Sequence, residues 1–208
     1  MLIFDMDGTL IDSNGIWRDV DIACLKKRNM PYTKEYYEGV AHTIFPLAAV
    51  FTKEYCHLEE STDEIMAEWM EMAGDMYATA VTVKPGVRAY LEQCRERGER
   101  MMVLTSSVPE HCRTALTHLG LMEFFERIVF AQELGLEKKN PDCFRKAAAA
   151  GGVKPEECTM FDDSVAACRG AKAAGLQVVG VYDSYFDMTW DEMQQVCDRC
   201  IRSFEEMA

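Results

Sequence analysis

The sequence predicts an α/β fold in which a parallel sheet carries helices on both faces and a helical segment is inserted after the first strand. Three observations lead to this fold class. The apolar run Met1–Phe4 is typical of a buried strand. Residues 14–80 contain little strand character. From about residue 85 onward, apolar runs of strand length alternate with helical segments, and such alternation predicts parallel strands connected by helices.

The domain boundaries follow from this change of pattern. We expect a sheet-containing core at residues 1–13 and 81–208 and a helical domain at 14–80. Apolar residues recur at helical spacing in Glu64–Ala80, and Asp63 is a suitable start for that helix. Gly39 and Pro46 predict a loop between helices within Tyr36–Leu47.

The core elements are taken in chain order. We expect strands at Arg100–Leu104, Ile128–Phe130, Thr159–Phe161 and Val178–Val181. We expect helices at Pro109–Leu119, at about Pro141–Ala150, from just after Asp163 to about Ala174, and at Trp190–Phe204. Pro109 and Pro141 suit the first turn of a helix. Gly151 and Gly175 suit the residues that follow a helix end.

Composition limits the possible functions of the chain. Of its 208 residues, 49% are hydrophobic and 27% charged, as in ordinary globular proteins. The net charge of −13 argues against binding to nucleic acid or an anionic membrane, which requires a basic face. No apolar run has the length of a membrane span. Because Met1 leads directly into a strand, we expect no signal peptide and a cytoplasmic protein, whose nine scattered cysteines are reduced thiols.

Carboxylates recur where predicted strands end. Asp5 and Asp7 follow the first strand, and Asp162 and Asp163 follow a later one. Open α/β sheets bind their ligands at this edge, and strand alternation sends Asp5 and Asp7 to the same face. Each like-charge pair at about 4 Å costs roughly 4 kcal/mol at an effective dielectric constant near 20. The cluster therefore predicts a hard cation such as Mg²⁺, although an Asp-Gly turn or a helix cap would also place acids here.

Two further signals fit an anionic ligand at the same edge. Thr105, Ser106 and Ser107 follow an apolar strand and precede a helix, where hydroxyl and backbone N–H groups can hold phosphate oxygens. Ser107 could also cap that helix. Lys138 lies three residues before Pro141, and a lysine at this edge would hold a phosphoryl group as a point charge.

Four segments together resemble the haloacid dehalogenase-like hydrolase superfamily. DMDGTLIDS is similar to the first motif of that family, VLTSS to the second, Lys138 with Pro141 to the third, and FDDS to the fourth. The stretch that begins at Lys84 resembles the return from the cap to the core. The resemblance covers nearly the whole chain and is greatest to the β-phosphoglucomutase-like and phosphoglycolate phosphatase-like branch. It implies a Rossmann-like core with an inserted helical cap of the C1 type.

The resemblance also implies a role for each motif residue. Asp5 would be the nucleophile that forms an aspartyl-phosphate, and Asp7 the general acid and base. The phosphoryl group would be held by Thr105, Ser106 and Lys138. The Mg²⁺ ligands would be Asp5, Asp162, Asp163 and the backbone carbonyl of Asp7.

Asp7 indicates which chemistry to expect, because an acid at this position is useful when a leaving alkoxide must be protonated. The family's dehalogenases lack it. We therefore expect a Mg²⁺-dependent phosphatase acting on a small phosphorylated metabolite, such as a sugar phosphate, with a phosphomutase of the β-phosphoglucomutase type as the alternative. Trp17 stands where the mutase carries a histidine. In the cap, Gly39 and His42 lie in the segment that resembles the specificity loop.

Overall fold

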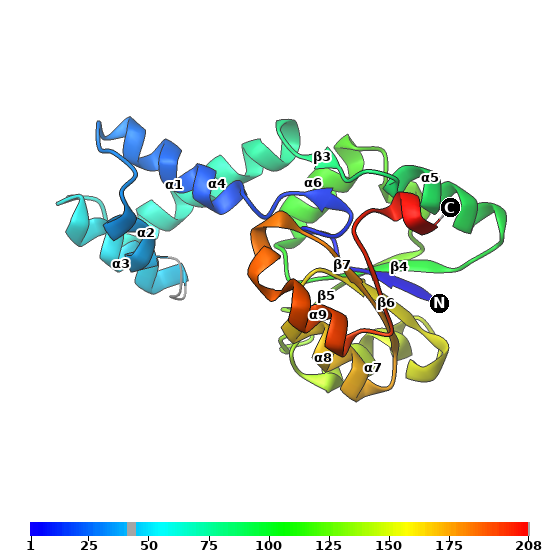
Figure 1. Cartoon of the computed structure of the whole chain (residues 1–208). Coiled ribbons are helices and arrows are strands. Elements are labelled where there is room, and N and C mark those ends of the chain that lie inside the picture. Colours follow the sequence, from blue (N-terminus) through cyan, green and yellow to red (C-terminus); the bar gives the residue numbers. More distant parts are fainter. Residues whose placement is uncertain (41–44, 208) are drawn as a thin grey trace. The chain divides into compact units, whose positions relative to one another are not determined.

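The structure, a computed structural model, describes residues 1–40 and 45–207. Internal contacts divide the chain into two compact units, Met1–Asn14 with Val81–Ala208, and Gly15–Ala80. The first unit contains the sheet, and the second is helical (Figure 1). Among the described helices, none combines the length and the apolar character needed to cross a membrane.

The sheet of the first unit has six parallel strands. In spatial order they are β5 (Arg127–Phe130), β4 (Met101–Thr105), β1 (Leu2–Phe4), β6 (Thr159–Asp162), β7 (Gln177–Val181) and β8 (Arg199–Ile201). Strand β1 lies between β4 and β6, in register from Leu2 opposite both Met101 and Thr159. The predicted fold class is confirmed, and the N-terminal strand occupies the centre of the sheet.

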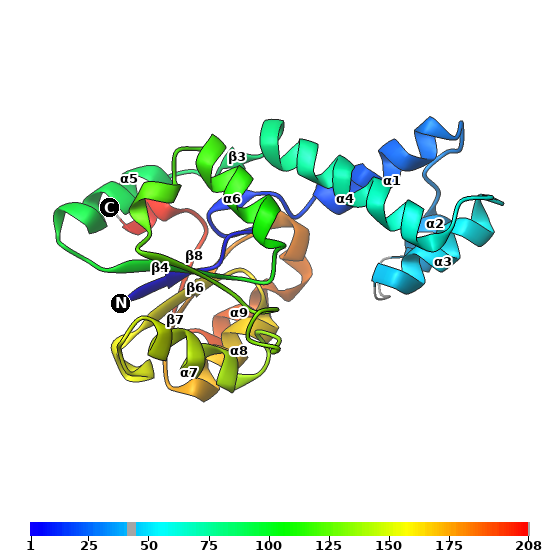
Figure 2. The ribbon, with the colours of Figure 1, turned by 180° about the vertical axis from the view of Figure 1, so that it is seen from behind.

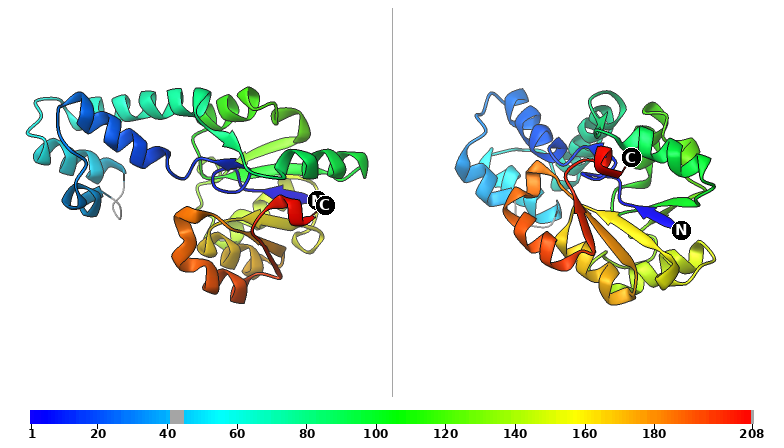
Figure 3. Two further views of the ribbon diagram at one scale, coloured as in Figure 1. Left: turned by 45° about the horizontal axis from the view of Figure 1, so that its top comes forward. Right: turned by 45° about the vertical axis from the view of Figure 1, so that its right-hand side comes forward.

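Helices cover both faces of this sheet. Helices α5 (Val87–Glu96) and α6 (Pro109–His118) lie on one side, and α7 (Pro141–Ala150), α8 (Val165–Ala174) and α9 (Trp190–Val196) lie on the other (Figures 1 and 2). Figure 3 shows the same arrangement with the sheet seen from two further directions, the green helices opposite the yellow and orange ones.

Alternation along the central strands builds a core on each face. Ile3 and Met160 belong to the cluster that includes the buried residues of α7 and α8. On the other face, the ring of Phe4 stacks on Phe161 with centroids 4.7 Å apart and meets Tyr90 of α5 at 6.4 Å. Burying a phenylalanine side chain contributes about 1.5–3 kcal/mol, so the strand that leads to Asp5 is among the most firmly held parts of the unit.

Most predicted core elements are present. Helix α7 has the predicted bounds, and Asn140 caps it by accepting a hydrogen bond from the Asp142 N–H at 3.0 Å. Helix α8 ends at Gly175, which adopts the left-handed conformation at φ 98°. Local sequence and tertiary fold agree at these positions.

The predicted helix Trp190–Phe204 is wrong beyond its first half. Helix α9 ends at Val196, and the chain turns at Cys197 into strand β8. The Asp198 carboxylate accepts a hydrogen bond from the Val178 N–H at 2.8 Å, and Ile201 pairs with Val181. Pairing with a distant strand therefore overrides the helical tendency of this segment.

A second small sheet was not predicted. Strands β2 (Ile11–Asp12) and β3 (Thr82–Val83) pair antiparallel, so the residues just before and just after the inserted unit lie side by side in the first unit. Two-residue strands give no periodicity that sequence analysis can detect.

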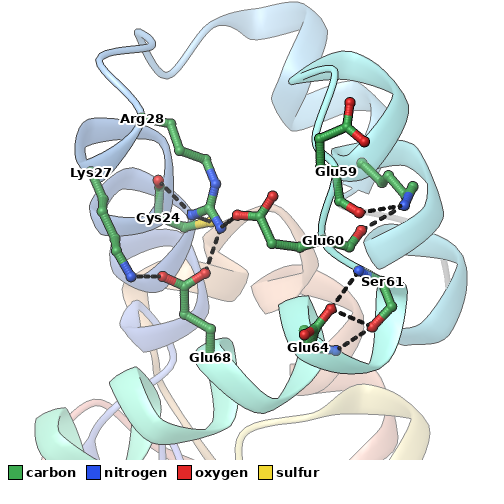
Figure 4. Close-up of polar contacts among 9 residues, drawn as sticks. Cys24, Lys27, Arg28, Glu59, Glu60, Ser61, Glu64 and Glu68 are labelled. Atoms are coloured by element: carbon green, nitrogen blue, oxygen red, sulfur yellow. Dashed lines mark hydrogen bonds and ion pairs between the residues drawn. The ribbon is translucent and has the colours of Figure 1, made fainter.

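The second unit consists, in its described part, of α1 (Ile16–Lys27), α2 (Lys34–Val40), α3 (Phe45–Tyr55) and α4 (Thr62–Thr79). Helix α4 begins at Thr62, one residue before the predicted Asp63, and its start is closed by a capping box formed by Ser61 and Glu64. Figure 4 shows the Arg28 guanidinium between Glu60, at 3.2 Å, and Glu68, at 2.6 Å. These ion pairs connect the end of α1 to α4, through Glu68, and to the segment just before α4, through Glu60.

Candidate active site

Three adjacent central strands place polar residues at their carboxyl ends. Asp5 directly follows β1, Thr105 is the last residue of β4, and Asp162 is the last residue of β6. They line one pocket of about 340 Å³. Its other lining residues are Asp7, Asn14, Ser106, Ser107, Glu137, Lys138, Lys139, Asp163, Ser164, Ala166, Ala167 and Phe186. The structure therefore brings together all the site residues that the sequence indicated in the core.

Lys138 joins two of the acids. Its ammonium lies 2.6 Å from Oδ1 of Asp5 and 2.8 Å from Oδ2 of Asp162. The lysine is carried by the loop between β5 and α7, and its side chain is 10% exposed. The loop approaches α8 at Gly170, where a Cβ would lie 2.3 Å from the Lys138 carbonyl oxygen. Close backbone contact with Gly170 thus sets the position of the lysine. No local sequence pattern indicates this contact.

Asp163 is held by Thr9 of the first motif and by Asn14, which directly follows that motif. Its Oδ1 accepts a hydrogen bond from the Thr9 hydroxyl at 3.1 Å, and its Oδ2 accepts one from the Asn14 amide at 2.7 Å. Gly8 makes this approach possible, since a Cβ there would lie 2.1 Å from both Asn14 Nδ2 and Asp163 Oδ2, and its φ is 74°. Thr9 belongs to the motif and Asn14 directly follows it. The sequence indicated no role for either residue, because their partner is about 150 residues away.

Asp7 reaches the pocket by a different route from the one predicted. It lies within a tight turn, in which the Met6 carbonyl accepts hydrogen bonds from the N–H groups of Leu10 and Ile11, so strand alternation does not place it beside Asp5. The Ser13 hydroxyl donates to Oδ1 of Asp7 at 2.6 Å. Asp7 is half-buried, which leaves its carboxyl accessible to a ligand in the pocket.

Thr105, Ser106 and Ser107, at the end of β4, line the pocket. Thr105 is fully buried, and its hydroxyl oxygen accepts a hydrogen bond from the Ser107 N–H at 3.0 Å. Val108, rather than Ser107, occupies the capping position of α6. Ser106 and Ser107 are therefore left to face the pocket.

The pKa values of three ionisable groups at this site are strongly shifted. Burial raises the pKa of Asp5 well above its usual value, with Lys138 opposing the rise and the neighbouring acids adding to it. Burial and the charge of Asp162 raise the pKa of Asp163 to about 7. Burial alone would lower the pKa of Lys138, but the carboxylates of Asp162 and Asp5 outweigh it and raise that pKa. The lysine therefore stays charged while the acids bind protons readily.

The acids also satisfy the chemistry of a metal site. Asp5, Asp162 and Asp163 each offer a carboxylate oxygen, and these oxygens lie within 4.8 Å of one another. Three carboxylates exceed the single positive charge of Lys138, and a divalent cation would balance the difference. An all-oxygen donor set fits a hard cation.

The predicted cap residues fall in the second unit. Gly39 lies inside α2, where a Cβ would be 2.2 Å from the Phe51 ring, so it allows α2 and α3 to pack closely. His42 lies outside the described residues. Trp17 of α1 is 39% exposed and meets the Phe45 ring edge-on at 5.5 Å.

Comparison with known proteins agrees with this geometry. A family model described as haloacid dehalogenase-like hydrolase matches residues 1–175. A phosphorylated carbohydrates phosphatase of Thermotoga maritima is 24% identical over 187 residues, which cover 89% of this chain and 87% of the relative. Validoxylamine A 7'-phosphate phosphatase of Streptomyces hygroscopicus subsp. limoneus is 29% identical over 86% of this chain and 84% of its own.

Solved structures show the same fold. The crystal structure of a candidate β-phosphoglucomutase from Thermotoga maritima has a TM-score of 0.87 at 22% identity, over 99% of this chain and 95% of that chain. The resemblance seen in the four motifs is thus confirmed, as is the prediction that the chain is an enzyme of this class. With most of its length matched by the family model, the chain belongs to the haloacid dehalogenase-like hydrolases.

Proposed function

We propose that this hydrolase is a Mg²⁺-dependent phosphatase that cleaves a small phosphate monoester through an aspartyl-phosphate on Asp5. The observation that carries the proposal is a single pocket lined by two carboxylates at the first motif, a buried ammonium and several hydroxyls. The names of the two relatives described above support a small phosphorylated metabolite, such as a sugar phosphate, as the substrate.

In the first step, a carboxylate oxygen of Asp5 attacks phosphorus as the bond from phosphorus to the ester oxygen breaks. Lys138, 2.6 Å from Oδ1 of Asp5, orients the nucleophile and balances charge on the transferring group. Thr105 and Ser106 donate hydrogen bonds to the phosphoryl oxygens. Asp7 gives its proton to the departing alkoxide.

In the second step, water attacks the phosphorus of the aspartyl-phosphate. Asp7, now ionised, takes a proton from this water, and the bond from phosphorus to the Asp5 oxygen breaks. Inorganic phosphate leaves, and Asp7 is again protonated for the next cycle. Covalent catalysis divides one difficult hydrolysis into two easier steps.

We assign the metal site to Asp5, Asp162 and Asp163, with the backbone carbonyl of Asp7 as a further ligand. When bound, Mg²⁺ supplies positive charge to the phosphoryl oxygens and to the nucleophile. Asp162 also accepts hydrogen bonds from Lys138 and from the Ser164 N–H, so this acid helps to fix the lysine.

We assign the choice of leaving group to the inserted unit, residues 14–80, as a cap, with Gly39 and His42 as candidate specificity residues. Trp17 supports hydrolysis over the mutase alternative, because an indole cannot exchange protons with a sugar hydroxyl as a histidine can. We also place the enzyme in the cytoplasm, in keeping with its nine free cysteines, and expect a small metabolite rather than nucleic acid or membrane as its partner.

The test is phosphate release from a panel of phosphorylated metabolites with Mg²⁺. We expect wild-type protein to release phosphate from at least one ester, Asp5→Asn to release none, and EDTA to abolish turnover. Asp191→Asn, at an exposed acid of α9, is the matched control and should keep full activity. Equal release by wild type and Asp5→Asn would refute the proposal, and conversion of a sugar phosphate to its isomer without net release would favour the mutase.

A further inference from the structure

We infer that Lys84 and Asp183 form a positioning pair that fixes two segments of the pocket wall, the Asp7–Gly8 turn and the segment that contains Phe186. Neither residue belongs to the four motifs. The inference rests on the proposed function for its effect on rate, but the contacts that carry it are independent of that function.

Lys84 is a buried lysine that directly follows β3. Its ammonium donates to the Gly8 carbonyl at 2.5 Å, to the Tyr182 carbonyl at 2.8 Å and to Oδ2 of Asp183 at 2.8 Å. An ammonium has three donors, and all three are engaged. The side chains of Lys84 and Asp183 are 13% and 5% exposed, so little water is available to replace these bonds.

The contact with Gly8 restrains the turn that carries Asp7. Gly8 donates its N–H to the Ile11 carbonyl at 2.9 Å, and its own carbonyl accepts from Lys84. A glycine has wide backbone freedom, so this peptide needs restraint at both ends to hold one conformation. Fixing it fixes the backbone from which the Asp7 carboxyl is presented.

The contact with Asp183 restrains a second segment of the pocket wall, the one that contains Phe186. Oδ1 of Asp183 accepts a hydrogen bond from the Tyr185 N–H at 2.9 Å and so caps the short helix η3 (Ser184–Thr189). That helix is interrupted at Phe186, whose φ of −110° and ψ of 22° are not helical. Phe186 lines the pocket together with Asp7 and Asp163. The two oxygens of one carboxylate thus connect the lysine to the aromatic wall of the site.

The ion pair also suits the electrostatics of the pocket. Asp183 lies near enough to Asp163 for its charge to act on it, and a further uncompensated acid would add to the repulsion among the metal-binding carboxylates. Lys84 neutralises Asp183 at 2.8 Å and is itself not a lining residue of that pocket. The ion pair therefore restrains the Asp7–Gly8 turn and the Phe186 segment, and it adds no net charge to the surroundings of the pocket.

The variant Lys84→Met keeps the unbranched side chain to within one atom of its length and removes its three donors. We expect turnover of an alkyl phosphate, whose leaving oxygen needs the proton of Asp7, to fall by about 10- to 100-fold, since displacement of a catalytic group by about 1 Å has this effect. Formation of the aspartyl-phosphate from p-nitrophenyl phosphate should fall much less, because p-nitrophenolate leaves without that proton. A purely structural role would reduce both reactions equally.

The double variant Lys84→Met/Asp183→Asn separates positioning from stability. It leaves no unpaired buried charge, and the asparagine oxygen still accepts from Tyr185, so we expect thermal stability to return toward wild type while the rate stays low. Lys172→Met is the matched control. It removes a Lys–Asp ion pair of the same unit, with Asp198 at 2.6 Å and at the surface, and should change neither rate.

Hydrogen exchange of the full-length protein tests the inference without any substrate. We expect Lys84→Met, but not Lys172→Met, to speed exchange at residues 6–11 and 183–189. Unchanged exchange there, or recovery of the wild-type rate by the double variant, would overturn the inference. Failure of the wild-type protein to hydrolyse any ester would instead refute the proposed function and leave the exchange result standing.

Discussion

Replacing Gly170 with alanine tests whether the position of Lys138 limits activity. The new Cβ would lie 2.3 Å from the Lys138 carbonyl oxygen and 2.9 Å from the Phe144 ring. To reach even 3.0 Å, below which real Cβ contacts essentially do not occur, the carbonyl must retreat by about 0.7 Å. Displacements of about 1 Å can cost about 100-fold in rate, so we expect kcat/KM to fall about 10- to 100-fold.

Stability should change far less than rate in this variant. Alanine gains about 1 kcal/mol over glycine inside a helix, which offsets much of the roughly 1–3 kcal/mol cost of overpacking. The assay is phosphate release under saturating Mg²⁺, paired with urea unfolding. Gly98→Ala is the control, because its φ of 71° strains alanine while nothing lies within 4 Å, so it should lose about 1 kcal/mol and no activity. A Gly170→Ala enzyme with wild-type kcat/KM would refute the reasoning.

Three further predictions concern the acids. Mg²⁺ at about 100 times its Kd should stabilise the protein by about 2.7 kcal/mol, a rise in Tm of roughly 5–10 °C by differential scanning fluorimetry; an equal rise in Asp163→Asn would contradict the metal site. Asp7→Asn should release p-nitrophenol in a single burst and accumulate phosphorylated protein, since the second step lacks its base; steady turnover at the wild-type rate would count against that role. Without divalent metal, the free energy of unfolding should fall as pH rises from about 4 to about 7, because the raised pKa values of Asp5 and Asp163 make the native state bind more protons than the unfolded chain. Urea titrations at several pH values would show a smaller fall in Asp163→Asn, and an unchanged slope would be evidence against the assignment.

Local sequence was a good guide wherever short-range chemistry decides the structure. Helix α7 is delimited by Asn140, Pro141 and the glycines that follow it, and its bounds were predictable. The strands that lead to Asp5, Thr105 and Asp162 are apolar runs bounded by polar residues. Because these strands are parallel, their carboxyl ends meet at one edge of the sheet. The main site residues were therefore predictable from the sequence.

Other parts of the structure depend on contacts between residues distant in sequence, and these parts were not predictable. The sequence predicts a helix where strand β8 lies. Residues Arg199–Ile201 form a strand because they pair with Val179–Val181, and this pairing leaves no mark in the local sequence. Strands β2 and β3 are too short to show any period. The turn that carries Asp7 depends on Lys84, which is 76 residues from Gly8 in sequence.

The sequence by itself determined the fold class, the family resemblance and the acids, hydroxyls and lysine of the pocket, since these follow from local periodicity and from the residue types that phosphoryl chemistry requires. Only the tertiary structure decided how those groups are held. Gly170 allows the Lys138 loop to approach α8, Thr9 and Asn14 orient Asp163, and Lys84 with Asp183 ties together two segments of the pocket wall. Each of these contacts joins residues remote in sequence, so no local pattern records it.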